Sequence, residues 1–213
     1  TFILDGAQSA GHLPIHVADM HIDLLCVPGH KGLYGPQGSG MIVCGSDRWV
    51  RGETLVEGGS GMHSLDSAMP DVLPERYEAG TLPTPAIAGL REGIRFVRQI
   101  GLPVIHQTEA ALWRSAYERL SEMPGVRLYD DTPGSVLLFN VEGMSSVDVG
   151  AVLDSRGICV RSGYHCAPMA HRTIGTAEMG GVRASFGVMN TDRDVLRFAD
   201  AVRQIARDAK NGV

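Results

Sequence analysis

Two side chains that could do chemistry together stand near the start of the chain, the carboxylate of Asp5 and the amine of Lys31. Lys31 lies in the glycine-rich stretch CVPGHKGLYGPQGSG (26–40). A lysine amine can form an imine with an aldehyde cofactor such as pyridoxal phosphate, whose ring nitrogen needs a carboxylate partner. The alternative is a surface lysine in a turn. A P-loop is excluded, because no Gly-Lys-Ser/Thr occurs.

Both residues follow short apolar runs. TFILD (1–5) ends at Asp5, and Lys31 follows IDLLCVP (22–28). Runs without alternation are typical of strands covered on both faces of an α/β sheet, where strand ends gather at a ligand-binding edge. Gln8 could then bond the hydroxyl of a cofactor ring, and His30 could contact its phosphate.

A second candidate is the thiol of Cys166 in RSGYHCAPMAH, where glycine, proline and polar neighbours indicate an exposed loop. Arg161 and His165 are close in sequence, and positive neighbours favour the reactive thiolate. The alternatives are an incidental loop thiol or a zinc site made with His165 and His171. The spacing of these three residues fits no common zinc pattern.

The other three cysteines, Cys26, Cys44 and Cys159, lie in apolar runs. We expect buried free thiols there, which suits a reducing cytosol and a cytoplasmic protein. The net charge of −5 gives no reason to expect nucleic acid or an anionic membrane as partner. No apolar stretch approaches the roughly 20 residues that span a bilayer.

The elements that must position these side chains form two predicted domains, 1–101 and 102–213. In the first, a third strand is expected over 39–45 and a helix over 85–101, with a long Gly- and Pro-rich connection between them. A helix over 104–123 leads into the second domain, because its apolar residues recur at helical spacing.

The rest of the second domain reads as a small α+β unit. The expected strands are 125–130, 135–141, 158–162 and 181–186, and the expected helices are 145–157 and 192–210. Both of these helices open with a hydroxyl and a carboxylate three residues apart, Ser145 with Asp148 and Thr191 with Asp194. Such pairs resemble capping boxes with Asp in place of Glu.

Four motifs occur in order along the chain: DGAQSAG…HIDLLCVPGHKGLYGPQGSG, ERYEAGTLPTPAIAGL, VRSGYHCAPMAH and VRASFGVMNTDRDV. Together they resemble the class V aminotransferase family of pyridoxal-phosphate enzymes of fold type I. Within it they are similar to the cysteine desulfurase and selenocysteine lyase branch. The resemblance implies the C-terminal portion of such an enzyme: the later part of an α/β large domain with a mostly parallel sheet, then a small α+β domain.

The resemblance also implies roles for the N-terminal residues. Lys31 would be the Schiff-base lysine, Asp5 the partner of the pyridinium and Gln8 the contact of the ring hydroxyl. His30 would contact the phosphate. Thr81, in EAGT, would reach a phosphate in the partner subunit of a homodimer.

In the second domain, Arg183 would bind the substrate carboxylate as a bidentate fork, with Arg161 beside it. Cys166 would be the nucleophile that takes sulfur from L-cysteine, releasing alanine and leaving a persulfide for a sulfur-acceptor protein. Selenocysteine would follow the same route without strictly needing the thiol.

The match departs from the family in two ways. Pro28 stands where many relatives have Ser or Thr, so it offers the phosphate neither a hydroxyl nor an N–H. The earlier half of the cofactor domain is not found within 1–213, so we expect weak cofactor binding, little activity by this chain alone, and exposed apolar area on the strands at 1–5 and 22–28. Two alternatives stay open: a class V aminotransferase or epimerase without sulfur chemistry, and a non-catalytic chain that binds no cofactor.

Overall fold

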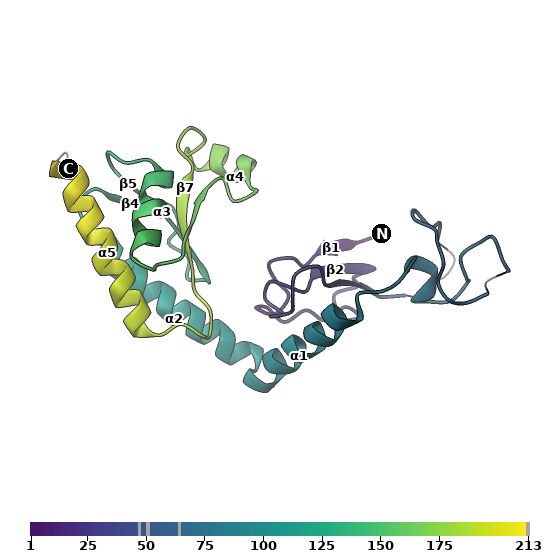
Figure 1. Ribbon diagram of the computed structural model, residues 1–213. Helices are drawn as coiled ribbons and strands as arrows, with labels where there is room; N and C mark the ends of the chain where they lie inside the picture. Colours follow the sequence, from purple (N-terminus) through teal and green to yellow (C-terminus); the bar gives the residue numbers. More distant parts are fainter. Residues whose placement is uncertain (47, 50–51, 64, 212–213) are drawn as a thin grey trace. The chain divides into compact units, whose positions relative to one another are not determined.

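The computed structural model describes residues 1–46, 48–49, 52–63 and 65–211. The contacts within the chain divide it into two compact units, Thr1–Leu102 and Pro103–Val213 (Figure 1). None of the helices in the described residues combines the length and the apolar character needed to cross a membrane.

The first unit contains a three-stranded sheet and one long helix. Its elements are β1 (Ile3–Asp5), β2 (Leu24–Pro28), β3 (Gly40–Cys44), a 3₁₀ turn η2 (Glu75–Tyr77) and α1 (Thr84–Ile100). β1 pairs in parallel with β2, and β3 pairs antiparallel to β2. The sheet of this unit is therefore mixed. The connection from β2 to β3 is shorter than the dozen or more residues that a parallel crossover needs.

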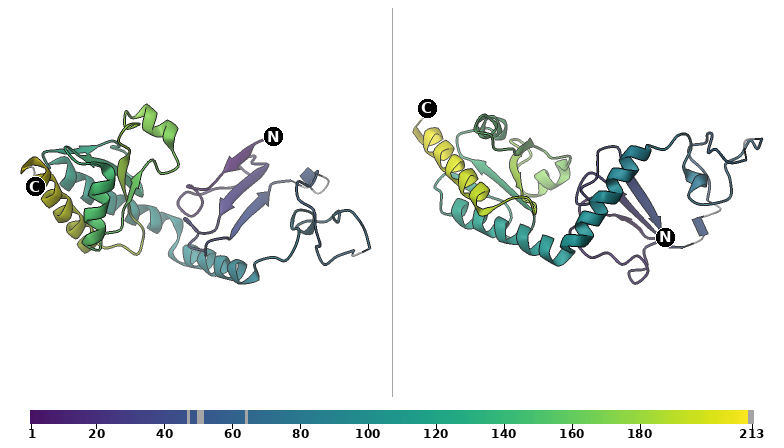
Figure 2. Two further views of the ribbon diagram at one scale, coloured as in Figure 1. Left: turned by 45° about the horizontal axis from the view of Figure 1, so that its top comes forward. Right: turned by 60° about the horizontal axis from the view of Figure 1, so that its bottom comes forward.

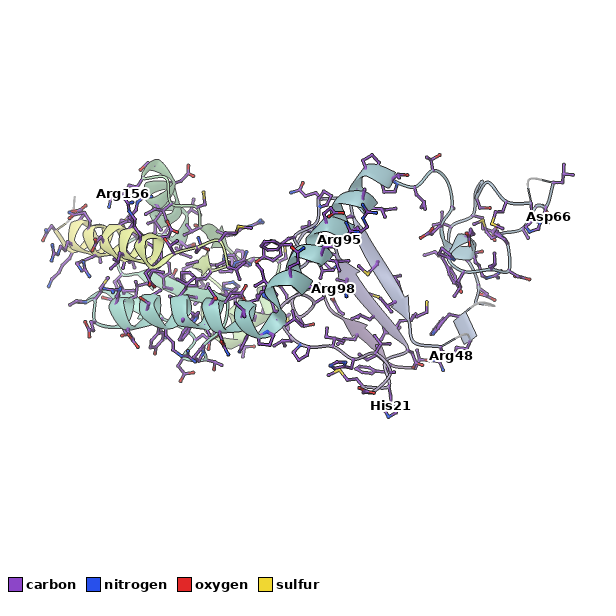
Figure 3. The ribbon with its side chains drawn as sticks, turned by 90° about the horizontal axis from the view of Figure 1, so that it is seen from below. His21, Arg48, Asp66, Arg95, Arg98 and Arg156 are labelled. Atoms are coloured by element: carbon purple, nitrogen blue, oxygen red, sulfur yellow. The ribbon has the colours of Figure 1, made fainter. Side chains whose placement is uncertain are left out.

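The start of β1 is tied to the residue before β2. The backbone N–H of Phe2 donates to Asp23 at 2.6 Å, and Arg48, labelled in Figure 3, lies 2.7 Å from the other carboxylate oxygen. The Phe2 bond, followed by the charge of Arg48, holds the pKa of Asp23 below its usual value against the opposing effect of burial. These contacts fix the parallel register in which Asp5 lies opposite Cys26.

The sheet of the first unit exposes apolar side chains over 1–5, as the sequence predicted. The same prediction is wrong over 22–28, where Ile22, Leu25 and Val27 are buried. Phe2, Ile3 and Val43 are exposed, and 64% of Ile42 is accessible. The prediction of buried thiols is wrong at Cys44, which is exposed at the end of β3, and Cys26 is only half-buried. The strands are apolar, but within the described residues the sheet is not covered on both faces.

Helix α1 packs against the loop that follows Lys31. A Cβ added to Gly93 would lie 2.2 Å from the backbone oxygen of Leu33, and the rings of Tyr34 and Phe96 meet edge to face with centroids 5.1 Å apart. Since Gly93 lets the helix approach the loop backbone directly, α1 holds the loop that carries the candidate amine.

Replacing Gly93 by alanine tests this contact. In an open helix the change would stabilise by roughly 0.5–1 kcal/mol. Here we expect destabilisation by about 1–3 kcal/mol, because the new methyl group meets backbone that cannot swing away. Urea unfolding measures the change, and Gly59→Ala is the control, since a Cβ there meets nothing within 4 Å. A more stable Gly93→Ala variant would show that α1 does not press on this loop.

The second unit begins with the long helix α2 (Leu102–Ser121), whose first residue is the last of unit 1. It continues with β4 (Val126–Leu128), β5 (Val136–Val141), α3 (Ser146–Ser155), β6 (Arg161–Gly163), α4 (Pro168–Thr173), β7 (Gly181–Ser185) and α5 (Asp192–Asn211). The strands form one antiparallel sheet in the order β4-β5-β7-β6. Figure 2 shows α4 near the start of β7 and away from α5.

One apolar core joins the elements of this unit. Helices α3 and α5 contact each other and the sheet, and Trp113 of α2 is buried and donates its indole N–H to the backbone oxygen of Val136. The predicted caps form: Ser145 accepts the N–H of Asp148, and Asp194 accepts the N–H of Thr191. The core thus fixes the sheet from which β6 and β7 extend.

Two features differ from the sequence prediction. The strand expected over 158–162 is β6, which begins only at Arg161, because the N–H of Ile158 bonds back to Leu153 at the end of α3. Cys159 is therefore exposed in irregular chain rather than buried in a strand. Helix α4 was not predicted, since six residues are too few to show a helical pattern.

Candidate active site

The first group of candidate residues lies at one edge of the sheet in unit 1. Because β1 and β2 are parallel, the loops that leave their carboxyl ends start from the same edge. Asp5 is the last residue of β1, and Lys31 follows β2 by three residues. Asp5 accepts the backbone N–H of Ala7 at 2.9 Å, which directs its carboxylate toward the loop that carries Gln8.

Close backbone contact holds these two loops together. Gly11, at φ +88°, lies so near Gly32 that an added Cβ would stand 2.0 Å from the Gly32 carbonyl oxygen. A Cβ on Gly32 would in turn stand 2.3 Å from the carbonyl oxygen of Ala10. The segment after Asp5 and the segment holding Lys31 therefore pack as one surface, and the structure brings these two candidates to the same side of the sheet.

The side chains of Gln8, His30 and Lys31 are exposed, and within the described part of the chain none of them has a hydrogen-bond partner. Thr81 is also exposed, in the connection before α1. The loop backbone is ordered by its own bonds, with Gly29 donating to Ser39 and accepting from Gly35. A rigid loop thus presents an uncommitted amine and imidazole.

This set of groups fits pyridoxal phosphate by its chemistry. A carboxylate suits a protonated ring nitrogen, an amine suits the aldehyde, an amide suits the ring hydroxyl and an imidazole suits the phosphate. Asp5, Lys31, Gln8 and His30 supply these four groups from two adjacent loops. Pro28 has no N–H, and the N–H of Gly29 already bonds to Ser39, so neither backbone group serves the phosphate.

The second group surrounds Cys166 in unit 2. Cys166 is exposed in a turn between β6 and α4, where it has a positive φ of 59°. Arg161 on β6 lies directly opposite Arg183 on β7. Two guanidinium groups therefore project from one face of the sheet beside the strand end that leads to the thiol.

The two arginines have no carboxylate partner within the described residues. Arg183 is half-buried, and its Nε is buried without a hydrogen-bond partner in the described structure. Like charges opposite each other in a sheet are destabilising unless an anion lies between them. This arrangement favours a bound carboxylate, and it argues against the structural ion pair that is the usual role of a lone arginine.

His165 does not supply the positive charge that its position suggested. Burial, followed by the charges of Arg183, His171 and Arg161, lowers the pKa of His165, although its bond to the Arg161 carbonyl opposes the shift. His165 is therefore largely neutral near pH 7. The arginines carry the positive charge near Cys166, and the expectation of a cationic His165 is wrong.

The lowered pKa of His165 predicts a pH dependence of stability. The unfolded chain binds a proton at His165 near the usual pKa of about 6.5, whereas the folded protein resists it. Proton uptake by the unfolded state then lowers the free energy of unfolding as the pH falls below this value. We expect urea unfolding to show less stability at pH 5.5 than at pH 7.5, with a smaller difference in a His165→Asn variant. An equal difference in both proteins would contradict the assignment.

The structure gives no support to a zinc site at these residues. The ring nitrogens of His165 and His171 bond to each other at 3.3 Å rather than converging on an open position. Among the described residues, no cluster of three or more His, Cys, Asp or Glu side chains could hold a metal ion. No pattern in the sequence predicted the role of Thr176, which is buried and bonds to His171 at 2.7 Å.

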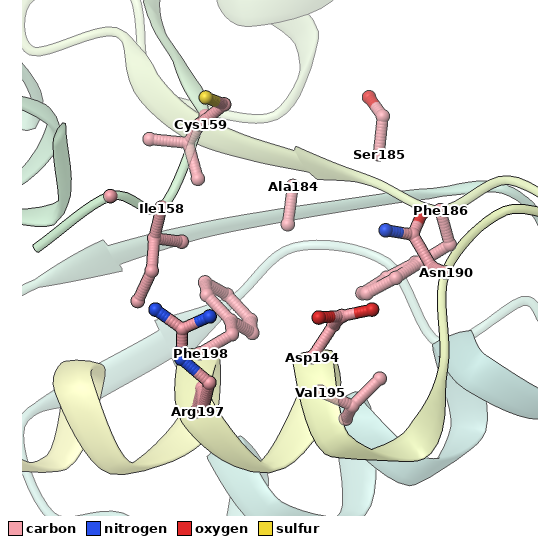
Figure 4. A pocket seen from close by; sticks show the side chains of 12 residues that line it. Ile158, Cys159, Ala184, Ser185, Phe186, Asn190, Asp194, Val195, Arg197 and Phe198 are labelled. Carbon is pink, nitrogen blue, oxygen red and sulfur yellow. The ribbon is translucent and has the colours of Figure 1, made fainter.

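A separate pocket of about 260 Å³ lies between β7, α5 and the segment before β6 (Figure 4). Cys159, Asp194 and Asn190 are among its lining residues. Asp194 caps α5, and Asn190 accepts the N–H of Gly187, so these polar groups are used by the fold. The pocket contains none of the candidate residues.

Comparison with known proteins found similar sequences and similar structures. The family model for class-V aminotransferases matches residues 1–198. A probable cysteine desulfurase of Methanothermobacter thermautotrophicus is 33% identical over 211 residues, which cover 96% of this chain and 53% of that protein.

Two similar solved structures are also those of cysteine desulfurases. The apo cysteine desulfurase of Thermococcus onnurineus NA1 matches with a TM-score of 0.85 and 35% identity, over 97% of this chain and 52% of that one. Cysteine desulfurase CsdA of Escherichia coli, solved in an S-sulfonic acid form, matches with a TM-score of 0.83 and 28% identity, over 95% and 50% of the two chains. The chain thus spans about half the length of each of these relatives.

Proposed function

Because the chain belongs to the class-V aminotransferase family, whose enzymes work with pyridoxal phosphate, we propose that it carries out cysteine desulfuration, moving the sulfur of L-cysteine to Cys166. The observation that carries the proposal is the exposed thiol turn next to two arginines that, in the part of the chain the structure describes, have no carboxylate partner. An amino transfer needs no thiol there. The names of the similar proteins support the same reading.

The residues of unit 1 would hold the cofactor. Lys31 would bind it covalently through Nζ, Asp5 would keep its ring nitrogen protonated, and Gln8 and His30 would contact its hydroxyl and phosphate. When bound, pyridoxal phosphate supplies an electron sink for the carbon skeleton of the substrate. Lys31, once exchanged for the substrate amine, would take the proton from the substrate Cα.

The residues of unit 2 would handle the substrate and its sulfur. Arg183, with Arg161, would bind the carboxylate through charge-assisted bonds. The Cys166 thiolate would attack the substrate sulfur, so that an S–S bond forms as the Cβ–S bond breaks. The electron pair of the broken bond stays on the substrate carbon skeleton, which leaves as alanine after protonation. Cys166 is left as a persulfide, ready for a sulfur-acceptor protein.

The proposal extends to the assembly and the compartment. Thr81 would reach a phosphate in a second copy of the chain, in a homodimer, and the protein would work in the cytoplasm. The other half of each relative has no counterpart in residues 1–213. We therefore expect this chain alone to hold the cofactor weakly and to react slowly.

Adding pyridoxal phosphate and then L-cysteine tests the function. We expect alanine to form in step with a mass gain of one sulfur atom on the peptide that contains Cys166. Formation of a keto acid without a persulfide would overturn the proposal in favour of an aminotransferase. Absence of any cofactor absorbance, even at saturating pyridoxal phosphate, would favour a non-catalytic chain.

Arg183 provides a second test. Replacing Arg183 by glutamine should raise the KM for L-cysteine by about 10- to 100-fold, because a charge-assisted bond contributes about 1.5–3 kcal/mol. The free energy of unfolding should not fall, because the change relieves repulsion from Arg161. Arg172→Gln, on exposed α4, is the control. Loss of stability with unchanged KM would assign Arg183 a structural role.

A further inference from the structure

Three side chains next to Cys166 form a continuous chain of hydrogen bonds. Nε2 of His165 lies 2.9 Å from the carbonyl oxygen of Arg161, and Nδ1 of His165 lies 3.3 Å from Nε2 of His171. Nδ1 of His171 lies 2.7 Å from Oγ1 of Thr176. His171 and Thr176 are buried, so the bond between them is shielded from water, whereas His165 is half-buried.

The direction of every bond follows from its first member. A carbonyl oxygen can only accept, so His165 carries a proton on Nε2 and donates it to Arg161. In neutral His165, Nδ1 is then an acceptor, and His171 must donate from its own Nε2. The Nδ1 atom of a neutral His171 then accepts the hydroxyl proton of Thr176 at 2.7 Å, in preference to the His171 carbonyl oxygen, which lies 3.4 Å from the same hydroxyl. With both imidazoles in the neutral form, both therefore carry their proton on Nε2.

The turn that carries the thiol needs such support. The N–H of Ala167 donates to the carbonyl oxygen of Tyr164, and the two central residues, His165 and Cys166, have φ angles of 53° and 59°. Two consecutive positive φ angles are characteristic of a type I′ turn, which favours Gly and Asn. His165 and Cys166 are strained at these positive φ angles because neither is glycine. Other contacts in the fold must therefore hold the turn in place.

The residues just before β7 are held by side-chain hydrogen bonds of their own. Asn140 donates to the carbonyl oxygen of Gly180, and Ser146 donates to that of Met179. At the thiol end, among the described residues, the side-chain hydrogen bonds that tie the turn to the rest of the unit are those of His165. Its ring joins the turn to β6 on one side and to α4 on the other.

We propose that His171 and Thr176 are positioning residues that fix the tautomer of His165 and thereby hold the strained turn that presents Cys166. This inference depends on the proposed function only in taking Cys166 as the reacting thiol. Neither residue touches the thiol in the bonds described, so neither is catalytic. His165 cannot act as a base toward Cys166 in this state, because both of its ring nitrogens are already used.

Protonation of His165 should break its hydrogen bond to His171. The groups facing His165 are Arg161 from β6, Arg183 from β7 and His171 from α4, and the ring of Tyr164 packs edge to face on His171 with centroids 5.5 Å apart. A proton on His165 would place two donors between the imidazoles, with like charges around them. The turn should therefore loosen in acid.

Nitrogen NMR of the full chain, without cofactor or substrate, tests the arrangement in the wild-type protein. We expect ¹⁵N shifts that show the Nε2–H tautomer for both His165 and His171 at pH 7.5. An Nδ1–H tautomer at either residue, or a charged imidazole, would overturn the proposal. This measurement does not depend on any variant folding correctly.

Two substitutions then test the positioning role. Thr176→Val removes the hydroxyl at nearly constant shape. We expect amide hydrogen exchange at Ala167, whose N–H closes the turn, to rise about tenfold, because a buried acceptor is left unpaired. Thr176→Ser keeps the hydroxyl and should restore both the slow exchange and the His165 tautomer. Amide hydrogen exchange in β5 and β7 should be unchanged. Faster exchange there would indicate a general loosening of the unit instead.

Unchanged exchange and tautomer in Thr176→Val, or equal changes in Val and Ser variants, would overturn the inference. The outcome is separate from the proposed function, because no turnover is measured. Desulfuration that survives Cys166→Ala would refute the function and leave the turn measurements as they stand.

Discussion

A Cys166→Ala variant should lose cysteine desulfuration by about 10³-fold or more, since the change removes the nucleophile itself. Without the thiol, the substrate sulfur has no acceptor at the exposed turn between β6 and α4. The rate of alanine release from L-cysteine, compared between the two proteins under the same cofactor conditions, is the measurement. Slow turnover by this chain alone would lower both rates alike.

The chain offers matched controls. Cys44 and Cys159 are also exposed, but they lie at the end of β3 and in the pocket beside α5. Replacing either by alanine should leave desulfuration within about twofold of the original rate, as for surface changes away from the chemistry. Alanine release from selenocysteine should largely survive the loss of Cys166. Full cysteine activity in Cys166→Ala would remove this thiol from the reaction.

The second large effect is expected at Lys31. Replacing it by alanine should end covalent capture of pyridoxal phosphate and reduce alanine formation by about 10³-fold or more, because both the attachment point and the base are lost. Borohydride reduction followed by peptide mass spectrometry should find a pyridoxyl group on the 26–40 segment of the unaltered protein. This readout works even if the cofactor is held weakly.

Lys210 is the natural comparison, because the chain contains only these two lysines. It is exposed near the end of α5, far from the candidate residues in sequence. A Lys210→Ala variant should label at Lys31 as the unaltered protein does. If borohydride labelled Lys31 and Lys210 equally, Lys31 would be an ordinary surface amine.

Much of the fold could be predicted because apolar runs and cap pairs act locally. The runs ending at Asp5 and Pro28 became β1 and β2, and the pair Thr191 and Asp194 marked the start of α5. The Asp5 and Lys31 loops meet because parallel strands share an edge. This follows from topology, which an α/β pattern already implies.

Other features depend on contacts that sequence patterns do not encode. The prediction that Cys44 is buried was wrong, because the sequence of an apolar strand does not show which of its faces is covered. The lowered pKa of His165 arises first from burial and then from charges that include Arg183, which is eighteen residues away and brought close by strand pairing. The bond between His171 and Thr176 depends on α4, whose length is below what a pattern can reveal.

The backbone contact between Gly11 and Gly32 has a consequence for how this protein can change. A side chain at either position would push apart the two segments that carry the acid and the amine. In a library that randomises both codons and selects for function, we therefore expect both sites to return glycine, and tolerance at one to appear only together with rearrangement at the other. The sequences of the two loops should then change together in evolution rather than independently.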